Sequence, residues 1–303
     1  MKKLLVILAI LFSVVFNVNA QENIRKIATW NMKWLGTNSY NQLDAIENVN
    51  LYADYILRTE ATLFALQEIG ATHSISDEPK CFYLDQIVDT LNKSISNESD
   101  KWEYVLDGRN KNQRLAFLYK KDMWDVTNPH TINPGSSYRH IRKPFFITVQ
   151  AKGTNAELKF DFINVHLKAF SGADSRNKRE NNFEDLSAWL ETNTLDSDVL
   201  ISGDTNVYFG ESYVYQSLKD IDYKYLYDAE KTAIYEDILG QRFDRFYSSP
   251  GLLAEIQSAK QLVGSKEYID VIKDNDPDEI VFFDQNISDH YAVVLSIDVS
   301  RER

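Results

Sequence analysis

Acidic, amide and imidazole side chains follow strand-like runs at five places in the sequence. In Val199–Val207 (VLISGDTNV), β-forming residues lead into a turn-forming segment. Asp204 and Asn206 stand in that segment, where the backbone is expected to leave a buried strand. Loops at strand ends often carry catalytic groups, although this stretch is also typical of an ordinary Asp/Asn turn. The other four places bear on that choice, and they are Trp30–Asn31, Gln67–Glu68, His166 and Ser288–His290.

Glu68 follows the apolar run TLFALQ, so we expect its carboxylate at the rim of a sheet. Mg²⁺ is typically held by one or two carboxylates together with waters and substrate phosphate oxygens. Glu68 is therefore a candidate metal ligand. Asn31, at the end of the first expected strand, is placed to hydrogen-bond that carboxylate or the phosphate. A helix cap or a surface acid would give the same local pattern.

Two histidines are candidate acid–base groups. His166 ends the strand-like run DFINVH, where a lone histidine is more often structural than catalytic. His290 directly follows Asp289, and Asp244 adjoins another expected strand. An imidazole oriented by a carboxylate is the usual general base, because its pKa lies near the working pH. Two histidines and several acids around one site would suit attack of water at phosphorus.

Two basic clusters stand out in an acidic chain. Arg176, Lys178 and Arg179 begin an expected helix, where the helix dipole disfavours cations. Such local inconsistency tends to occur at functional sites. The second cluster is Arg139–Lys143 (RHIRK). Steering of a phosphate and simple solvation are both compatible with these clusters.

The hydrophobic pattern predicts many strands with helices interspersed. The expected strands are Ile24–Trp30, Thr62–Gln67, Trp102–Leu106, Arg114–Tyr119, Phe145–Ala151, Leu158–Val165, Val199–Ser202, Phe243–Tyr247 and Tyr291–Val299. The expected helices are Asn41–Arg58, Phe82–Leu91 and Arg176–Leu190, and Gly210–Gly240 is read as helix and loop without further order. Because no regular βαβ period occurs, the pattern favours packed sheets with helices outside over a doubly wound parallel sheet.

Residues 1–20 have the pattern of a secretory signal peptide. Lys2 and Lys3 are basic, Leu4–Val15 is apolar, and Val18–Ala20 forms a small-residue end before Gln21. The apolar run is too short for a membrane anchor, and no cysteine follows it closely for lipid attachment. We therefore expect a secreted or periplasmic protein.

Residues 21–303 are expected to form a single domain, because no linker, repeat or low-complexity tract interrupts them. With 44% hydrophobic residues, the chain can bury a large core. Cys81 is the only cysteine, which excludes an intramolecular disulfide and a thiolate metal site. The formal charge of −12 becomes −14 when Lys2 and Lys3 are removed. This balance argues against broad electrostatic attraction to nucleic acid or to an anionic membrane.

Six segments, taken in order, resemble the motif series of the endonuclease/exonuclease/phosphatase superfamily, most closely its secreted, DNase I-like branch. They are TWNMKWLG, ALQEIG, NVHLKA, SGDTNV, RFDRFY and SDHYAVV, and the match spans residues 24–298. The resemblance implies an α/β fold of the α+β type, a DNase I-like four-layer αββα sandwich. It places the site at one rim of the two sheets.

The resemblance also implies a metal site. Glu68 would be the principal Mg²⁺ ligand with Asn31 beside it, and Asp289 would support a metal. Mn²⁺ is an alternative ion, and a structural Ca²⁺ site is left open.

For catalysis, the resemblance implies that Asp204 and Asn206 position the attacking water and the phosphate. His290, oriented by Asp244, and His166 would form the acid–base pair.

Arg142 resembles the family's phosphate-contacting arginine.

Three positions depart from the family pattern. Gln113 stands where members often carry an acid, so we expect His166 to lack a charged partner. Thr205 replaces the usual Phe of Gly-Asp-Phe-Asn, and Lys33 occupies a position that is acidic in the abasic-endonuclease branch, which argues against that activity.

The sequence therefore predicts a secreted, Mg²⁺-dependent phosphodiesterase, a monomer without a membrane anchor that cleaves DNA by in-line attack of water. The alternative in the same fold is hydrolysis of a phospholipid or small phosphoester, as in sphingomyelinases and inositol phosphatases. A catalytically dead binding module is a third hypothesis. The acids, amide and histidine retained at the motif positions argue against it; they are Glu68, Asp204, Asn206, Asp289 and His290.

Overall fold

The computed structural model describes residues 23–36, 45–70, 80–108, 113–135, 142–193, 197–226, 243–253, 283–284 and 287–300. The predicted signal peptide, the first residues of the predicted 41–58 helix and residues 227–240 lie outside this part of the chain. No helix within these ranges is long and apolar enough to cross a membrane.

The first sheet has the strand order β11-β1-β2-β4-β3. Its members are β1 (Ile24–Leu35), β2 (Leu63–Ile69), β3 (Trp102–Leu106), β4 (Arg114–Lys120) and β11 (Val293–Asp298). β1 and β2 run parallel, and the other neighbours run antiparallel.

The second sheet has the strand order β5-β6-β7-β8-β10-β9. Its members are β5 (Trp124–Thr131), β6 (Phe145–Ala151), β7 (Lys159–His166), β8 (Val199–Asp204), β9 (Lys224–Tyr225) and β10 (Asp244–Ser248). Here β7 and β8 form the parallel pair. Each sheet thus has one parallel pair at its centre, whose strands end at the same edge.

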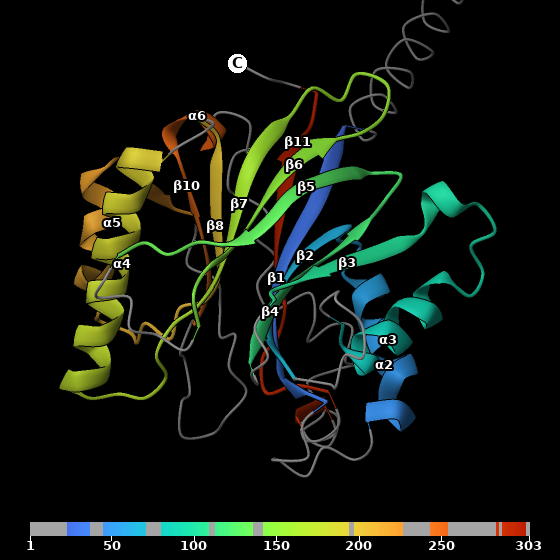
Figure 1. Ribbon diagram of the computed structural model, residues 1–303, viewed down its shortest axis with the longest axis horizontal. Helices are drawn as coiled ribbons and strands as arrows, with labels where there is room; N and C mark the ends of the chain where they lie inside the picture. The colour runs from blue at the N-terminus through green and yellow to red at the C-terminus, as the bar shows by residue number, and fades with distance from the viewer. Residues whose placement is uncertain are drawn as a thin grey trace, which may run out of the picture.

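Helices cover the outer face of each sheet, as Figure 1 shows. The helices α2 (Ala45–Arg58) and α3 (Phe82–Asn92) pack on the first sheet, and α4 (Ala173–Asn193) and α5 (Gln216–Asp220) pack on the second. Three short helical segments complete the described part; they are Glu98–Asp100 (η2), Ser212–Tyr215 (η3) and Pro250–Leu253 (α6). The predicted four-layer sandwich is confirmed.

Apolar side chains on the inner faces join the two sheets. Phe117 of the first sheet contacts Phe145 and Phe162 of the second, with ring centroids 5.6 and 4.9 Å apart. A separate apolar cluster lies between each sheet and its helices. Strands buried on both faces need continuous apolar runs. This explains why Val199–Ser202 reads as an unbroken hydrophobic segment.

The predicted elements differ from the structure at β1, β5 and α4. β1 continues beyond Trp30 to Leu35, because its pairing with β2 shifts register after Asn31 and then resumes. The strand β5 was not predicted, since it lies at a sheet edge with a mostly exposed, polar sequence. Helix α4 begins at Ala173 and ends at Asn193, a longer span than its apolar stripe indicates.

Candidate active site

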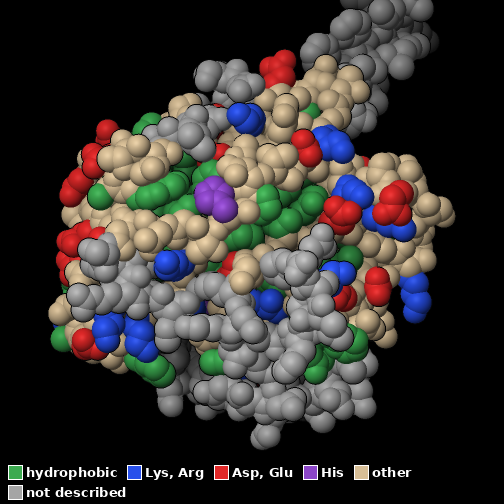
Figure 2. Space-filling model, in the orientation of Figure 1, with side chains coloured by type: hydrophobic (Ala, Val, Ile, Leu, Met, Phe, Trp, Pro, Cys, Tyr) green, Lys and Arg blue, Asp and Glu red, His purple; other side chains and the backbone are tan. Residues whose placement is uncertain are grey.

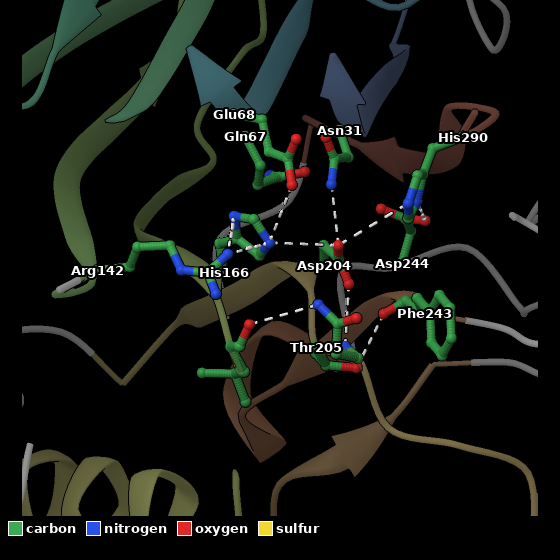
Figure 3. Close-up of polar contacts among 12 residues, drawn as sticks. Asn31, Gln67, Glu68, Arg142, His166, Asp204, Thr205, Phe243, Asp244 and His290 are labelled. Atoms are coloured by element: carbon green, nitrogen blue, oxygen red, sulfur yellow. Dashed lines mark hydrogen bonds and ion pairs between the residues drawn. The ribbon is translucent and has the colours of Figure 1, made fainter. Parts of the chain in front are cut away.

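The candidate site forms at the rim where the parallel pairs of the two sheets end. Asn31 of β1 lies opposite Gln67 of β2, and Glu68 is the next residue of β2, so Asn31 and Glu68 lie at the same end of the pair. In the other sheet His166 lies opposite Asp204, which in turn lies opposite Asp244. Figure 3 shows these side chains pointing toward one another from the two sheets.

A distorted backbone aims the residues of the first sheet. Lys33, Trp34 and Glu68 have φ angles of 43°, 56° and 60°, in the left-handed region that side chains rarely adopt. The backbone N–H of Trp34 donates to Glu68 Oε2 at 3.1 Å, and that of Lys33 donates to Asn31 Oδ1 at 3.0 Å. Such strain persists where surrounding structure enforces it, and it clusters at functional sites.

Two fully buried amides join the sheets directly behind the site. Gln67 Nε2 donates to Asn164 Oδ1 at 2.8 Å. Asn164 Nδ2 donates in turn to the carbonyl oxygens of Leu66 and Ala116, at 2.9 and 3.0 Å. Gln67 immediately precedes Glu68, and Asn164 lies two residues before His166, so this bridge sets the spacing between the two halves of the site. Sequence reasoning assigned neither amide a role; the signal was a polar residue inside an otherwise apolar strand.

Glu68 sits in a crowded, acidic environment. Burial, followed by the carboxylates of Asp289 and Asp204, raises its pKa to about 7 against smaller opposing effects of His290 and Arg142. Its Oε1 lies 3.5 Å from His166 Nε2.

Asp204 is the central acceptor of the site (Figure 3). Asn31 Nδ2 donates to its Oδ2 at 2.9 Å, and the backbone N–H of Asn206 donates to its Oδ1 at 2.9 Å. Oδ2 also lies 3.5 Å from His166 Nε2 and 4.0 Å from His290 Nε2. Burial raises the pKa of Asp204 to about 6.

His290 and Asp244 form a buried dyad, in which Asp244 Oδ2 lies 2.7 Å from His290 Nδ1. Burial by itself lowers the pKa of His290, but the carboxylates of Asp244, Asp204 and Asp289 outweigh it and raise that pKa well above its ordinary value. Asp289 is the more distant neighbour, with Oδ1 4.0 Å from His290 Nε2. The dyad leaves Nε2 directed toward Asp204.

The segment before β11 is anchored to β1. Trp30 Nε1 donates to the carbonyl of His290 at 2.9 Å, and the Ser288 hydroxyl donates to the carbonyl of Asn31 at 2.7 Å. Lys33 Nζ forms an ion pair with Asp284 Oδ1 at 2.6 Å. His290 therefore reaches the site because β1 holds its backbone.

His166 has charged neighbours after all. We expected it to lack a charged partner because Gln113 replaces an acid, but the carboxylates of Glu68 and Asp204 both lie 3.5 Å from its Nε2. Arg142 Nη1 contacts the same imidazole ring, 2.8 Å from Nδ1 and also against Nε2. That expectation is therefore wrong.

Asn206 lies beside this group with a φ of 49°. Its Nδ2 donates to the carbonyl of Leu167 at 3.3 Å, which ties the loop after β8 to the loop after β7. The Asn206 side-chain amide thus lies within the site, where it holds the backbone of Leu167.

Of the arginines considered for steering a phosphate, Arg176 and Arg179, the second does not reach the surface. Arg179 is fully buried, and it donates to the carbonyls of Lys168 and Phe170, both at 2.9 Å, and to Glu211 Oε2 at 2.8 Å. Arg176 stays partly exposed, 3.8 Å from Glu211 Oε1. Arg179 thus holds two loops together, and its burial does not suit contact with substrate. Sequence reasoning missed Glu211, which neutralises it.

The donor chemistry around Glu68 fits a hard divalent cation. Glu68 and Asp289 offer carboxylate oxygens, and the mutual repulsion that raises the pKa of Glu68 would be relieved by positive charge. Asn31 already uses its amide on Asp204 and its oxygen on Lys33, so its part in holding a metal stays a prediction. Within the described ranges, no group of three or more His, Cys, Asp or Glu forms a ready metal cage. Waters and substrate oxygens would have to complete the coordination of Mg²⁺.

Solved structures share this arrangement of sheets and helices. An endonuclease/exonuclease/phosphatase family protein from Bacteroides vulgatus superposes with a TM-score of 0.61 at 14% identity, covering 91% of this chain and 99% of that one. The chain has the endonuclease/exonuclease/phosphatase fold. The resemblance inferred from the six motifs is confirmed at this level, and the secreted branch stays a prediction.

Two further structures with this fold show how varied its members are. A mannosyl-6-phosphatase from Bacteroides thetaiotaomicron has a TM-score of 0.55 at 15% identity, covering 89% of this chain and 98% of that one. The TDP2 protein of D. rerio, complexed with a single-strand DNA product, has a TM-score of 0.58 at 14% identity, covering 90% and 98%. No protein-family model matches the sequence, and a search of curated proteins gave no relative.

Proposed function

We propose that the chain hydrolyses phosphoester bonds, and that its substrate is a nucleic acid phosphodiester such as DNA. The observation that carries this proposal is the meeting of Glu68, His166, Asp204 and the Asp244–His290 dyad at one rim of the fold. Two histidines facing a buried carboxylate supply a proton donor, a proton acceptor and a group that orients water.

Each group has a position that suits its part. Asp244 holds the His290 imidazole through Nδ1, which leaves Nε2 to exchange a proton with the reacting oxygens. Asp204 lies between both histidines and is held by Asn31, so it can orient the attacking water. Arg142 and His166 form a cationic corner for the phosphoryl oxygens. When bound at Glu68 and Asp289, Mg²⁺ would supply charge neutralisation for the phosphoryl group.

Two observations bear on the choice of nucleic acid over a small phosphoester, one for it and one against it. TDP2, which shares the fold, is seen with a single-strand DNA product. The acidic composition weighs the other way, since Figure 2 shows acidic and basic side chains interspersed over the coloured part of this face rather than a broad basic field. Hydrolysis of a small phosphoester is the second candidate, because a mannosyl-6-phosphatase shares the fold. Export is proposed from residues 1–20 alone.

An activity screen tests these proposals. The protein lacking residues 1–20 is incubated with single-stranded and duplex DNA, RNA, sphingomyelin and mannose 6-phosphate, each with Mg²⁺ and with excess chelator. We expect Mg²⁺-dependent cleavage of DNA, slowed at least ~10²-fold in the His290→Ala protein. Cleavage of the sugar phosphate alone would replace the nucleic acid proposal with the second candidate. Full activity after exhaustive chelation would contradict the role of Glu68 as a metal ligand.

A further inference from the structure

Two phenylalanine side chains lie in solvent on the loops that leave the site. Phe170, in the loop after β7, is 68% exposed, and Phe209, in the loop after β8, is 81% exposed. β7 and β8 are adjacent and parallel, so both loops rise from the same edge of the second sheet. Burying an apolar ring stabilises a fold, so rings kept in water beside a polar site point to a ligand that covers them.

The loop that carries Phe170 is held rigidly. Arg179 donates to the carbonyl of Phe170 at 2.9 Å, and its ion pair with Glu211 ties this loop to the one after β8. Phe170 has a φ of 78°, an uncommon conformation for a bulky side chain. Since these contacts hold the backbone at Phe170, little backbone entropy would be lost when a ligand covers the ring.

Lys168 connects this ring to the phosphate corner of the site. Its Nζ lies 4.6 Å from the centroid of the Phe170 ring. Burial lowers the pKa of Lys168, and the neighbouring charges of Arg142 and Lys178 lower it further. Lys168 also stands two residues after His166, the last residue of β7, whose imidazole ring is in contact with Arg142. From the reacting groups outward, the surface offers two cations and then an aromatic face.

We propose that Phe170 stacks on the nucleobase next to the scissile phosphate, with Lys168 beside the phosphate, so that the site takes single-stranded nucleic acid or a nucleotide. This inference rests on the proposed phosphoester hydrolysis and specifies its substrate. A nucleotide carries an anionic phosphate and a flat π face joined by one sugar, which matches the sequence of cations and ring. A sugar phosphate offers no π face. Bases inside a duplex are already stacked, whereas the bases of a single strand are free to stack on aromatic side chains.

Calorimetric binding to the Mg²⁺-loaded protein tests the inference without requiring turnover. The ligands are adenosine 5′-monophosphate and ribose 5-phosphate, which differ only in the base. Stacking of one base on an aromatic side chain corresponds to roughly 5- to 100-fold in affinity. We expect the nucleotide to bind at least about tenfold more tightly. Phe170→Ala should abolish that difference and leave ribose 5-phosphate binding unchanged, while Phe170→Trp should preserve it.

The controls separate the possible failures. Phe82 on α3 is also half-exposed, so Phe82→Ala should change neither affinity. Equal binding of both ligands to the unaltered protein would overturn the base subsite and leave the phosphoester proposal standing. An equal loss of affinity for both ligands in Phe170→Ala would mean that the ring only supports the loop, which also overturns the inference. If neither ligand binds, the base subsite is overturned, and the activity screen decides the proposed function separately. Sedimentation with phosphatidylcholine vesicles that depends on Phe170 would overturn it in favour of a lipid surface.

Discussion

Replacing Asn164 with leucine should destabilise the protein and weaken the site together. Asn164 is fully buried between the sheets and makes three hydrogen bonds, two of them to carbonyls of the first sheet. Leucine has the same number and branching of side-chain heavy atoms, so Asn164→Leu removes the polar bridge without leaving a large cavity. The carbonyls of Leu66 and Ala116 would then lose a donor at the place where the pairing of β2 with β4 shifts register.

The magnitude follows from these stranded groups. A buried polar group left without its partner costs ~1–3 kcal/mol, so two carbonyls amount to ~2–6 kcal/mol. The leucine side chain regains part of this through its apolar surface, at ~1.5–3 kcal/mol for full burial. Taking the middle of each range, we expect a net loss of about 2 kcal/mol in the free energy of unfolding. Gln67 retains two other acceptors, Thr29 Oγ1 and the carbonyl of Ala65, so it is not stranded.

Urea unfolding followed by tryptophan fluorescence measures this loss, provided that the dependence on denaturant is unchanged. A double-mutant cycle with Gln67→Leu isolates the contact between the two amides, and residues in direct contact should couple by ~0.5–3 kcal/mol. Phe162→Leu, on the same face of β7, is the matched control that loosens the interface without touching the bridge. Asn164→Leu should lower kcat more than Phe162→Leu does at equal stability loss. A stability change below about 0.5 kcal/mol with no coupling would refute the bridge as the element that spaces the site.

Three further predictions concern the site and its loops. Asp244→Asn and His290→Ala should each lower kcat by ~10²–10⁴ with little change in the unfolding midpoint. Steady-state kinetics measures the first quantity and circular dichroism the second. Near-normal rates would contradict the acid–base assignment. The metal-free carboxyl of Glu68 has a pKa of about 7, so it is largely protonated at pH 6. Mg²⁺ should therefore bind more tightly as the pH rises from 6 to 8. Binding at the lower pH should release a proton, which calorimetry in two buffers detects. Glu68→Gln should abolish that proton release, and an unchanged release would move the metal elsewhere. Arg179→Met should leave the largely buried carboxylate of Glu211 with only the more distant cation of Arg176 and cost ~3–5 kcal/mol in the free energy of unfolding measured in urea. A loss below about 1 kcal/mol would contradict the structural role of Arg179.

The sequence was most informative where local pattern and burial agree. Leu63–Leu66 before Glu68 and Val199–Ile201 before Asp204 are apolar because both strands are covered on each face, and the polar residues that follow them mark the rim. The positions of Asp204 and His166 followed from that rule. Their pairing with one another could not be predicted, since it depends on the register of two strands far apart in the chain.

Other parts of the site depend on tertiary contacts that leave no local signal. Lys33 and Trp34 adopt left-handed backbone although neither residue type favours it, so the bulge after Asn31 reads as a strand end. Arg179 has the appearance of a solvated helix residue, and only the loops that close over it bury its charge. Edge strand β5 is missing from the predicted elements because its exposed residues carry no alternating pattern.

The placement of β11 beside β1 has a consequence in time. Trp30 and His290 are 260 positions apart, yet the indole of one holds the backbone of the other. At ribosomal rates of ~5–20 residues per second, that distance corresponds to roughly 13–50 s of synthesis. Throughout this interval one edge of β1 has no strand to pair with, which leaves it open to pairing with other chains. Both members of the His290–Asp244 dyad are also among the last residues of the site to be made. A nascent chain therefore cannot use this dyad until β11 has closed the sheet, and a cut anywhere between residues 253 and 287 that releases the distal segment would separate the dyad.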